Sequence, residues 1–313
     1  MAVEFIYEQA PFPSCHASTI LEVAPGQLLA AWFGGTDEGE ADVAIWLTRH
    51  DGRWSAPEKV AEAAGVPCWN PVLFRERATG EVTLFYKAGP SPQSWSGFYR
   101  RSGDGGATFG DSYLLPAGLL GPIKNKPVQL DDGAILAPSS VESYQAWGCW
   151  MERSTDGGRT WTKHGPISHP DHPHGVIQPA ILRRADGSLL ALMRSRGVGQ
   201  VCSSESRDSG LTWSPAATVE MLPNPNSGID AVPMADGRQA LVGNPTHLAR
   251  TPLTLSLSED DGVTWHIAKV LEDAPGEYSY PAIIQSVDGT LHITYTWRRE
   301  RIRHQWFGLE ELA

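Results

Sequence analysis

Six polar residues recur about every fifty residues, each just ahead of a short apolar run that leads to a glycine turn. They are His16, Asn70, Lys126, Gln178, Asp230 and Tyr280. An apolar run whose only role is to fill the hydrophobic core would be expected to begin with Val or Ile. A polar residue at the same position in all six runs therefore indicates a shared role. Polar side chains that converge from several strands are what a ligand-binding mouth needs. The sequence therefore predicts that these residues surround one binding site.

A second set of charged residues lies close to the ends of the next apolar runs. It includes Asp37 and Glu38, Lys87, Glu142, Arg194, the polar pair Asn244 and His247, and Arg298 with Arg299, while Arg250 stands just before the predicted strand Leu253–Leu257. A guanidinium binds a carboxylate through two parallel hydrogen bonds and so fixes orientation as well as charge. These residue types suit a site for an acidic ligand.

The elements that must position these residues form a repeat. A turn glycine followed by an apolar strand occurs six times, at Gly26, Gly80, Gly133, Gly187, Gly237 and Gly289. The runs on both sides are short and rich in β-branched and aromatic residues, which predicts strands rather than helices. Each unit is predicted to contain, in this order, a first strand, a glycine turn, a second strand, a third strand, an Asp-containing turn and a fourth strand. Six such units predict an all-β, six-bladed β-propeller with four-stranded antiparallel blades, in one domain over residues 1–313.

The last unit is one strand short. After Trp297 only Gln305–Leu309 looks like a strand. We expect the N-terminal segment Val3–Tyr7 to supply the missing strand, which closes the ring and leaves no long open edge.

The Asp-containing turn has a sequence motif of its own. Ser154–Trp161 reads Ser-Thr-Asp-Gly-Gly-Arg-Thr-Trp, close copies occur at Ser206–Trp213 and Ser258–Trp265, a weaker one at Ser102–Phe109, and a stub at His50–Trp54. The Asp side chain can accept bonds from backbone N–H groups ahead of it, and glycine tolerates positive φ. The phrase predicts a hairpin turn on the outer rim, with an indole that enters the core. Such a turn stabilises its blade and carries no chemistry.

The amino-acid composition argues against two kinds of partner, nucleic acid and the interior of a membrane. The formal net charge is −11 and no basic run offsets it, which argues against nucleic acid. No stretch of 18 apolar residues is present, so no transmembrane helix is expected.

The compartment is predicted from the first residues and the cysteines. The start of the chain has neither the basic nor the apolar region of a signal peptide. Cys15, Cys68, Cys149 and Cys202 show no zinc-binding spacing and are interpreted as free, mostly buried thiols. We therefore expect a cytoplasmic protein.

The Asp-containing turn resembles the Asp-box, or BNR repeat, of the sialidase (neuraminidase)-like β-propellers. The segment Glu277–Ile284, followed by Asp288-Gly289, is similar to the family segment that carries the nucleophilic tyrosine, and the match falls on Tyr280. By the same resemblance, Arg194 and Arg250 match the second and third carboxylate-binding arginines of the family, and Asp37 matches its acid/base aspartate.

Two positions depart from the family pattern. His16 stands where the first arginine is expected, and Gln178 stands where a glutamate activates the tyrosine. Glutamine cannot take a proton, and a tyrosine phenol ordinarily ionises near pH 10. The resemblance implies retaining hydrolysis of an acidic oligosaccharide or glycoside, without a cofactor: Tyr280 attacks the anomeric carbon and Asp37 protonates the leaving oxygen.

Two other functions remain open. A propeller polysaccharide lyase would use His16 and Tyr280 as base and acid, with Gln178 and arginines to neutralise a uronate. A non-catalytic glycan-binding propeller is also compatible with Gln178. A lyase makes a product that absorbs in the near ultraviolet, whereas a hydrolase does not.

A stretch rich in Pro and His, His164 to His174, is predicted to link the third and fourth blades. His169, His172 and His174 could suggest a metal site, but the prolines and the lack of an acidic cluster favour a solvated loop over the mouth. We predict no metal.

Overall fold

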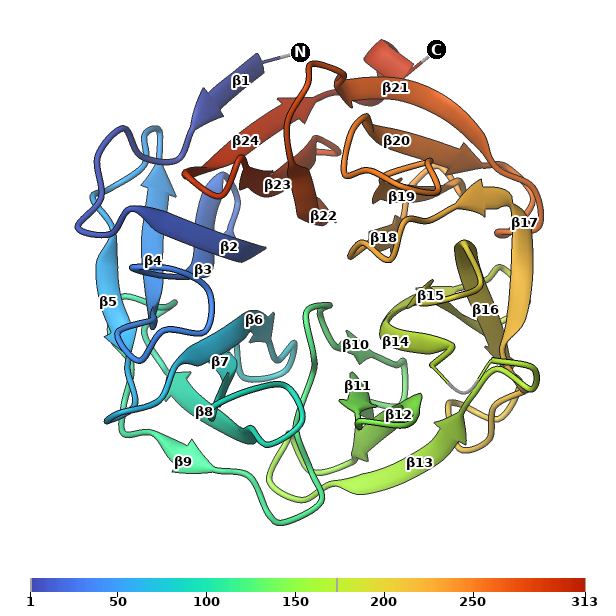
Figure 1. The fold of residues 1–313 in the computed structure, drawn as a ribbon, viewed down its shortest axis with the longest axis horizontal. Coiled ribbons are helices and arrows are strands. Elements are labelled where there is room, and N and C mark those ends of the chain that lie inside the picture. The colour runs from blue at the N-terminus through green and yellow to red at the C-terminus, as the bar shows by residue number, and fades with distance from the viewer. Residues whose placement is uncertain (1, 173, 313) are drawn as a thin grey trace. The chain divides into compact units, whose positions relative to one another are not determined.

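The computed structural model describes residues 2–172 and 174–312 (Figure 1). In these residues β1–β24 form six four-stranded antiparallel sheets, and one short 3-10 helix, η1 (Leu309–Leu312), follows the last strand. None of the helical structure in this part of the chain is long and apolar enough to span a bilayer. The protein is an all-β six-bladed β-propeller, as the sequence predicted.

Each sheet is one blade. Blade 1 contains β2 (Ser14–Ala24), β3 (Gln27–Gly35), β4 (Ala44–Asp51) and β5 (Glu58–Ala61). Blade 2 contains β6 (Cys68–Arg75), β7 (Val82–Ala88), β8 (Ser96–Ser102) and β9 (Tyr113–Leu114). Blade 3 contains β10 (Val128–Gln129), β11 (Ile135–Glu142), β12 (Trp147–Ser154) and β13 (Thr162–Ile167). Blade 4 contains β14 (Val176–Arg183), β15 (Leu189–Ser195), β16 (Gln200–Ser206) and β17 (Ala217–Pro223). Blade 5 contains β18 (Asp230–Pro233), β19 (Gln239–Gly243), β20 (Leu253–Ser258) and β21 (His266–Glu272).

Blade 6 combines both ends of the chain. Its strands are β22 (Tyr278–Gln285), β23 (Leu291–Trp297), β24 (Arg301–Phe307) and the N-terminal β1 (Ala2–Phe5). Ala2 pairs with Trp306 and Phe5 with Arg303, and the Ile6 N–H donates to the Ile302 carbonyl at 3.0 Å. The N-terminal strand therefore completes the last blade, as predicted, over slightly shifted bounds.

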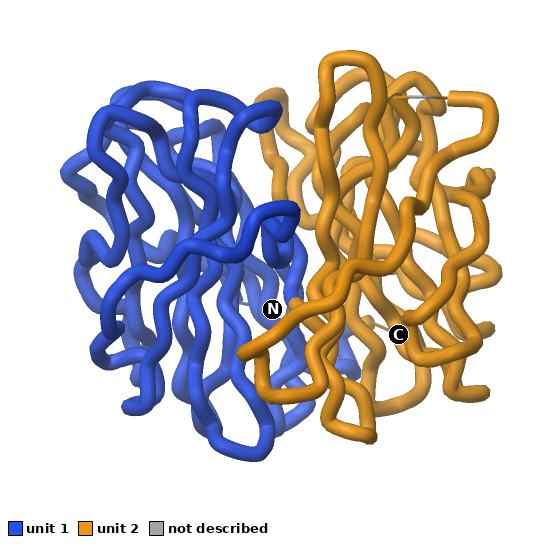
Figure 2. The backbone as a smooth tube through the Cα atoms, turned by 90° about the horizontal axis from the view of Figure 1, so that it is seen from below, with its two compact units in different colours: residues 1–126, 281–311 blue, residues 127–280, 312–313 orange. Residues whose placement is uncertain are grey.

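The chain forms two compact units, coloured separately in Figure 2. Unit 1 contains residues 1–126 and 281–311, which form blades 1 and 2 and most of blade 6. Unit 2 contains residues 127–280 and 312–313, which form blades 3, 4 and 5. The boundary falls inside β22, between Tyr280 and Pro281, and each unit is described by its own contacts.

The strands of unit 2 bury both faces. Leu189, Ala191 and Met193 of β15 pack with residues of blade 3, whereas Leu190 and Leu192 pack with residues of blade 5. Successive side chains of a strand point to opposite faces, so a blade between two neighbours needs an unbroken apolar run. This explains why the second strand of each unit reads as continuous apolar sequence.

The Asp-containing turns bond to themselves. Ser154 Oγ donates to Asp156 Oδ1 at 2.8 Å, and the Thr160 N–H and hydroxyl donate to the two carboxylate oxygens at 2.9 and 2.6 Å. The turns at Asp104, Asp208 and Asp260 share this pattern. These bonds confirm the predicted turn chemistry.

Two of the three tryptophans that follow the Asp-containing turns are less buried than the sequence predicted. Trp265 is buried, but Trp161 and Trp213 are only partly so. Each of these indoles donates to a glycine carbonyl of its own turn, for Trp161 that of Gly158 at 3.2 Å. The indole therefore caps the turn as much as it fills the core, because its N–H requires a partner.

The predicted linker between blades 3 and 4 begins later than expected. Residues 164–167 belong to β13, the outer strand of blade 3, so the connection starts at Ser168. His164 pairs with Met151 of β12, which shows that a histidine on an outer, half-exposed strand does not mark a loop. Within the connection His169 and His172 form an isolated bridge.

Candidate functional site

An equivalent irregularity marks the inner strand of several blades. Gln178 and Tyr280 are the third residues of β14 and β22, each precedes a proline, and their φ angles are +56° and +50°. Asn70 has the same place in β6, with a φ of +40°. The pairing register shifts around Gln178 and Asn70, as at a β-bulge. A bulge redirects one side chain, and strained backbone of this kind is concentrated at functional sites.

Within unit 2, Gln178 and Tyr280 both contact Arg194. Arg194, at the end of β15, donates from Nη1 to Tyr280 Oη at 2.5 Å and to Gln178 Oε1 at 3.2 Å. Gln178 Nε2 donates to the same phenol oxygen at 3.4 Å. The phenol oxygen therefore lies between a guanidinium and an amide.

Arg194 has no negatively charged partner among the described residues. Its Nε donates to Asn226 Oδ1 at 2.8 Å, so all of its partners are neutral, and the residue is only 7% exposed. A buried charge normally needs a counter-ion or a metal. This environment favours an anionic ligand at Arg194.

Arg250 is held in another way. Its guanidinium lies 5.6 Å from the centre of the Tyr280 ring and donates to Glu277 Oε1 at 2.8 Å. Ser279 Oγ donates to the same carboxylate oxygen at 2.9 Å. The Tyr278 N–H donates to the Arg250 carbonyl at 2.9 Å, which ties this turn to the start of β22. Arg250 is thus close to Tyr280 but already paired.

Blade 5 contributes one residue that the sequence did not indicate. Asp230, the predicted residue, is buried at the start of β18, and its carboxylate accepts from the Ala231 N–H at 2.9 Å. Asn226, in the preceding loop and at a φ of +59°, is the residue that bonds Arg194. An asparagine in a loop rich in Asn, Pro and Ser looks like ordinary turn sequence, so no signal distinguished it.

The other predicted residues belong to unit 1. His16 is buried in β2, with Nδ1 2.9 Å from Thr296 Oγ1 and its ring edge-on to Phe33. Asp37 lies in the exposed turn after β3, and its carboxylate accepts from the Glu38 N–H at 2.8 Å. Their convergence with the residues of unit 2 stays a prediction.

The remaining unit 1 residues have separate surroundings. Asn70 is buried in β6, and Arg298, at a φ of +55° in the turn after β23, stacks on Trp297 with its guanidinium 4.6 Å from the ring centre. Lys126 is partly buried ahead of β10.

In the segment ahead of β10 the residue at positive φ is Lys124, at +73°. Lys124 is 3% exposed, and its ammonium donates to Asn125 Oδ1 at 2.9 Å and to the Pro281 carbonyl. The sequence placed Lys126 at this position of the repeat, since Lys126 precedes a proline as Gln178 and Tyr280 do.

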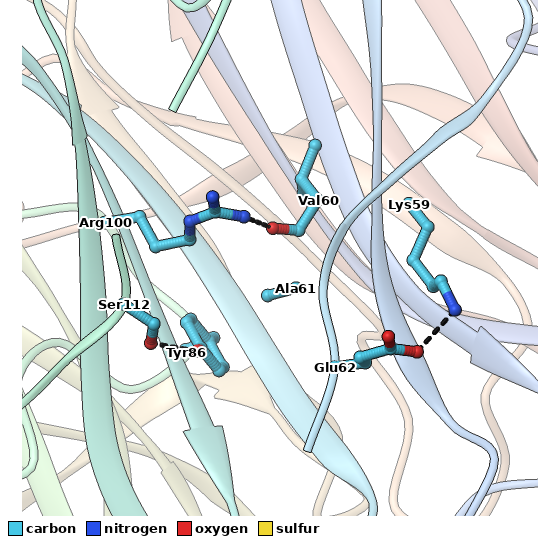
Figure 3. A pocket seen from close by; sticks show the side chains of 7 residues that line it. All are labelled: Lys59, Val60, Ala61, Glu62, Tyr86, Arg100 and Ser112. Carbon is cyan, nitrogen blue, oxygen red and sulfur yellow. Dashed lines mark hydrogen bonds and ion pairs between the residues drawn. The ribbon is translucent and has the colours of Figure 1, made fainter. Parts of the chain in front are cut away.

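One cavity lies elsewhere in unit 1. It has a volume of about 260 Å³ and is lined by residues of blades 1 and 2 (Figure 3). Tyr86 Oη and Ser112 Oγ are 2.5 Å apart, and Arg100 donates to the carbonyls of Val60, Phe109 and Gly110. These groups satisfy one another, and none of the predicted site residues lines the cavity.

Neither the thiols nor the histidines of the described residues offer an alternative centre. All four cysteines are free and buried, as predicted, and burial raises the pKa of Cys15, Cys68 and Cys202 to about 12. A thiol with so high a pKa is a poor nucleophile. Among residues 2–172 and 174–312, no three His, Cys, Asp or Glu side chains are grouped so that they could hold a metal.

Comparison with known proteins decides the family. The BNR repeat-like domain matches residues 26–293. The chain belongs to the BNR repeat-like family. A sialidase of Micromonospora viridifaciens is 30% identical over 152 residues, a match that covers 45% of this chain and 22% of that protein. The chain therefore aligns with less than a quarter of the length of this curated relative.

Solved sialidases share the fold of this BNR repeat-like protein. The NanB sialidase of Streptococcus pneumoniae superimposes with a TM-score of 0.81 at 13% identity, over 99% of this chain and 71% of that one. The intramolecular trans-sialidase of Ruminococcus gnavus superimposes with a TM-score of 0.79 at 13% identity, over 95% of both chains. At such identities the likeness establishes a sialidase-like propeller fold.

Proposed function

We propose that this protein binds a terminal sugar that carries a carboxylate and hydrolyses its glycosidic bond with retention of configuration. The observation that supports the proposal best is Arg194, a buried guanidinium with neutral partners that contacts Tyr280 Oη at 2.5 Å. Relatives named as sialidases suggest a sialylated glycan as the substrate class.

Each proposed role follows from the residue type and the family resemblance. Tyr280 Oη attacks the anomeric carbon, and a neutral phenol approaches an anionic sugar with less repulsion than a carboxylate would. Arg194 donates to that oxygen and stabilises negative charge that develops on it. The phenol proton passes to solvent, and Asp37 protonates the leaving oxygen as its bond to the sugar breaks. Water then hydrolyses the bond between the sugar and Tyr280, with Asp37 as the base that takes the proton of the water. Arg194 and Arg250 orient the sugar carboxylate.

Gln178 supports a second candidate, a glycan-binding propeller without catalysis. It occupies the place from which a base would act on Tyr280, 3.4 Å from the phenol oxygen, and it cannot accept a proton. The two candidates share the carboxylate-binding residues and differ in turnover.

Gln178→Glu separates these functions. If Tyr280 is a nucleophile, the new carboxylate can take its proton, so kcat for an aryl glycoside of N-acetylneuraminic acid should rise about tenfold or more. KM should rise as well, because a carboxylate 3.2 Å from Arg194 would compete with the substrate. Released sugar and near-ultraviolet absorbance are measured together over a panel of acidic oligosaccharides.

Gln285→Glu is the matched control, since Gln285 ends the same strand as Tyr280 and bonds the Gly289 carbonyl. It should leave turnover unchanged. Binding without released sugar in both wild type and Gln178→Glu would support the binding-only function. An ultraviolet-absorbing product that Gln178→Glu abolishes would indicate a lyase and contradict hydrolysis.

A further inference from the structure

The hairpin between β11 and β12 presents an exposed aromatic side chain on a rigid tip. The Ser143 N–H donates to the Ala146 carbonyl at 3.0 Å, and Ser143 Oγ bonds both the carbonyl and the N–H of Ala146. Tyr144, inside this tip, is 80% exposed. A large ring held in solvent by a bonded tip is suited to stack on a ligand, because little conformational entropy is lost when it binds.

A cation lies beside the base of the same hairpin. The Arg196 guanidinium is 5.2 Å from the centre of the Trp147 ring, and the His174 ring meets Trp147 edge-on at 6.2 Å. Arg196 is exposed and has no carboxylate partner in the described part of the chain. Stacking on the indole orders the guanidinium and leaves its N–H edges available for an anion.

The strands relate this cluster to the candidate site within unit 2. The Gln178 N–H donates to Ser140 Oγ at 3.2 Å, so Ser140 marks the level of Gln178 along β11. Glu142, which pairs with Trp147, lies two residues further toward the tip, and Tyr144 lies four residues further. At about 3.3 Å per residue the step to Glu142 is about 7 Å, roughly the length of one sugar residue, and Tyr144 lies beyond the end of the strand, in the tip.

The position of Arg196 after β15 leads to the same placement of the cluster relative to the candidate site. Arg196 is two residues beyond Arg194, and its N–H donates to the Gly175 carbonyl at 2.9 Å, ahead of β14. Arg196 and Trp147 are therefore placed one step outward from the residues that contact Tyr280.

We propose that Tyr144, Trp147 and Arg196 form a subsite for the second sugar of an acidic oligosaccharide. Arg196 binds the carboxylate of that sugar, and Tyr144 stacks on its ring or on the next one. This inference rests on the proposed function, since it extends the site for the terminal sugar. It makes the protein selective for chains of acidic sugars over single ones.

Calorimetric titration with N-acetylneuraminic acid and with its α2,8-linked dimer tests the subsite. A Tyr280→Phe background prevents cleavage of the dimer. We expect Arg196→Gln to weaken dimer binding about tenfold and Tyr144→Ala about fivefold. Monosaccharide affinity should stay within about twofold of the background value, because the first sugar does not reach these residues.

Two matched controls separate the subsite from general surface effects. Arg207→Gln removes an exposed arginine that follows β16 at the end opposite to Arg196. Tyr113→Ala removes a half-exposed tyrosine on β9 of unit 1. Neither should change the affinity for the monomer or for the dimer.

The outcomes separate the subsite from the proposed function. If dimer affinity is unchanged in Arg196→Gln and Tyr144→Ala, or if monomer affinity falls equally, the subsite is wrong and the proposed function is unaffected. If the wild-type protein releases no sugar but the variants lose dimer affinity selectively, hydrolysis is wrong and the subsite is supported. If the background protein binds neither probe, both are overturned.

Discussion

At the scale of single residues, the two arginines beside Tyr280, Arg194 and Arg250, differ in what neutralises them. Arg250 is paired with Glu277 at 2.8 Å, whereas Arg194 is more deeply buried and has only amide and phenol partners. A buried ion without a counter-ion is costly, and an anionic ligand would supply the missing charge. Arg194 is therefore the better anchor for a carboxylate.

Replacement of Arg194 tests this anchor. Arg194→Ala should weaken the binding of N-acetylneuraminic acid by about 2–5 kcal/mol, because the ligand charge would lose its partner in a desolvated site. Arg194→Lys should recover little of it, since an ammonium lacks the planar fork. Calorimetric titration measures the affinity.

Arg301→Ala is a suitable control for Arg194, because Arg301 pairs with Glu8 on blade 6 at 2.9 Å and was not predicted in the site. It should bind the sugar as wild type does. Equal affinity in Arg194→Ala and wild type would rule out carboxylate binding at Arg194.

At the scale of elements, blades 2 and 4 each combine a bulged inner strand with an outer turn whose Asp carboxylate bonds within the turn. In blade 4 the bulge at Gln178 holds a polar side chain on strained backbone, whereas the Asp208 carboxylate bonds only within its own turn. Function and local stability are thus carried by different elements of one repeat.

Asp156→Ala should therefore destabilise the protein without affecting the ligand. The change removes carboxylate bonds to Ser154 and Thr160, and we expect a loss of about 1–2 kcal/mol in the free energy of unfolding. Urea unfolding measures it, and sugar affinity should not change.

The incomplete copy of the turn motif in blade 1, at His50–Trp54, provides a control for Asp156→Ala. Arg49 stands two residues before Asp51, where the other turns have a serine, and no side-chain bond of Asp51 is found in the described residues. Asp51→Ala should stay within about 0.5 kcal/mol of wild type. An equally large loss at both positions would mean that the turn network is not what stabilises the blade.

At the scale of the whole molecule, the two ends of the chain meet in blade 6 around a polar cluster. His292 Nδ1 lies 3.0 Å from His304 Nε2, and His304 Nδ1 lies 3.3 Å from Glu4 Oε1 on the N-terminal strand. Trp54 of blade 1 donates to the same Glu4 oxygen at 2.9 Å. Burial, reinforced by the neighbouring His304, lowers the pKa of His292 to about 4, and burial also lowers that of His304.

This cluster should make stability depend on pH. The unfolded chain takes up a proton on His292 near pH 6.5, whereas the folded chain does so only near pH 4. Stability should therefore fall as the pH drops from about 6.5 to about 4, by roughly 1–2 kcal/mol after allowance for solvent screening. Urea unfolding at pH 8, 6.5, 5.5 and 4.5 measures this slope.

His292→Gln should flatten the slope, because it removes the titrating group. His266→Gln is the control, since His266 is exposed on β21. A wild-type slope that persists in His292→Gln would place the pH dependence elsewhere.

The sequence by itself determined the repeat. Turn glycines, Asp-Gly phrases and apolar runs are local signals, and their period was enough to predict six four-stranded blades and the pairing of the N-terminal strand. It also indicated Gln178, Arg194, Arg250 and Tyr280, three of which contact one another directly. Gln178 and Tyr280 could be found because polar residues stand ahead of apolar runs at matching positions, whereas Arg194 and Arg250 were assigned by the family resemblance.

Only the tertiary structure decided how those residues are held. The positive φ angles at Gln178 and Tyr280, the bond from Arg194 to Asn226 and the pairing of Arg250 with Glu277 depend on residues far apart in the chain. Bulges arise where a strand must fit its neighbours, and the neutralisation of a charge depends on which groups packing brings near it. Neither the position of a bulge nor the neutralisation of a charge is a property of local sequence. The turns could therefore be predicted from the sequence, and the environment of the arginines could not.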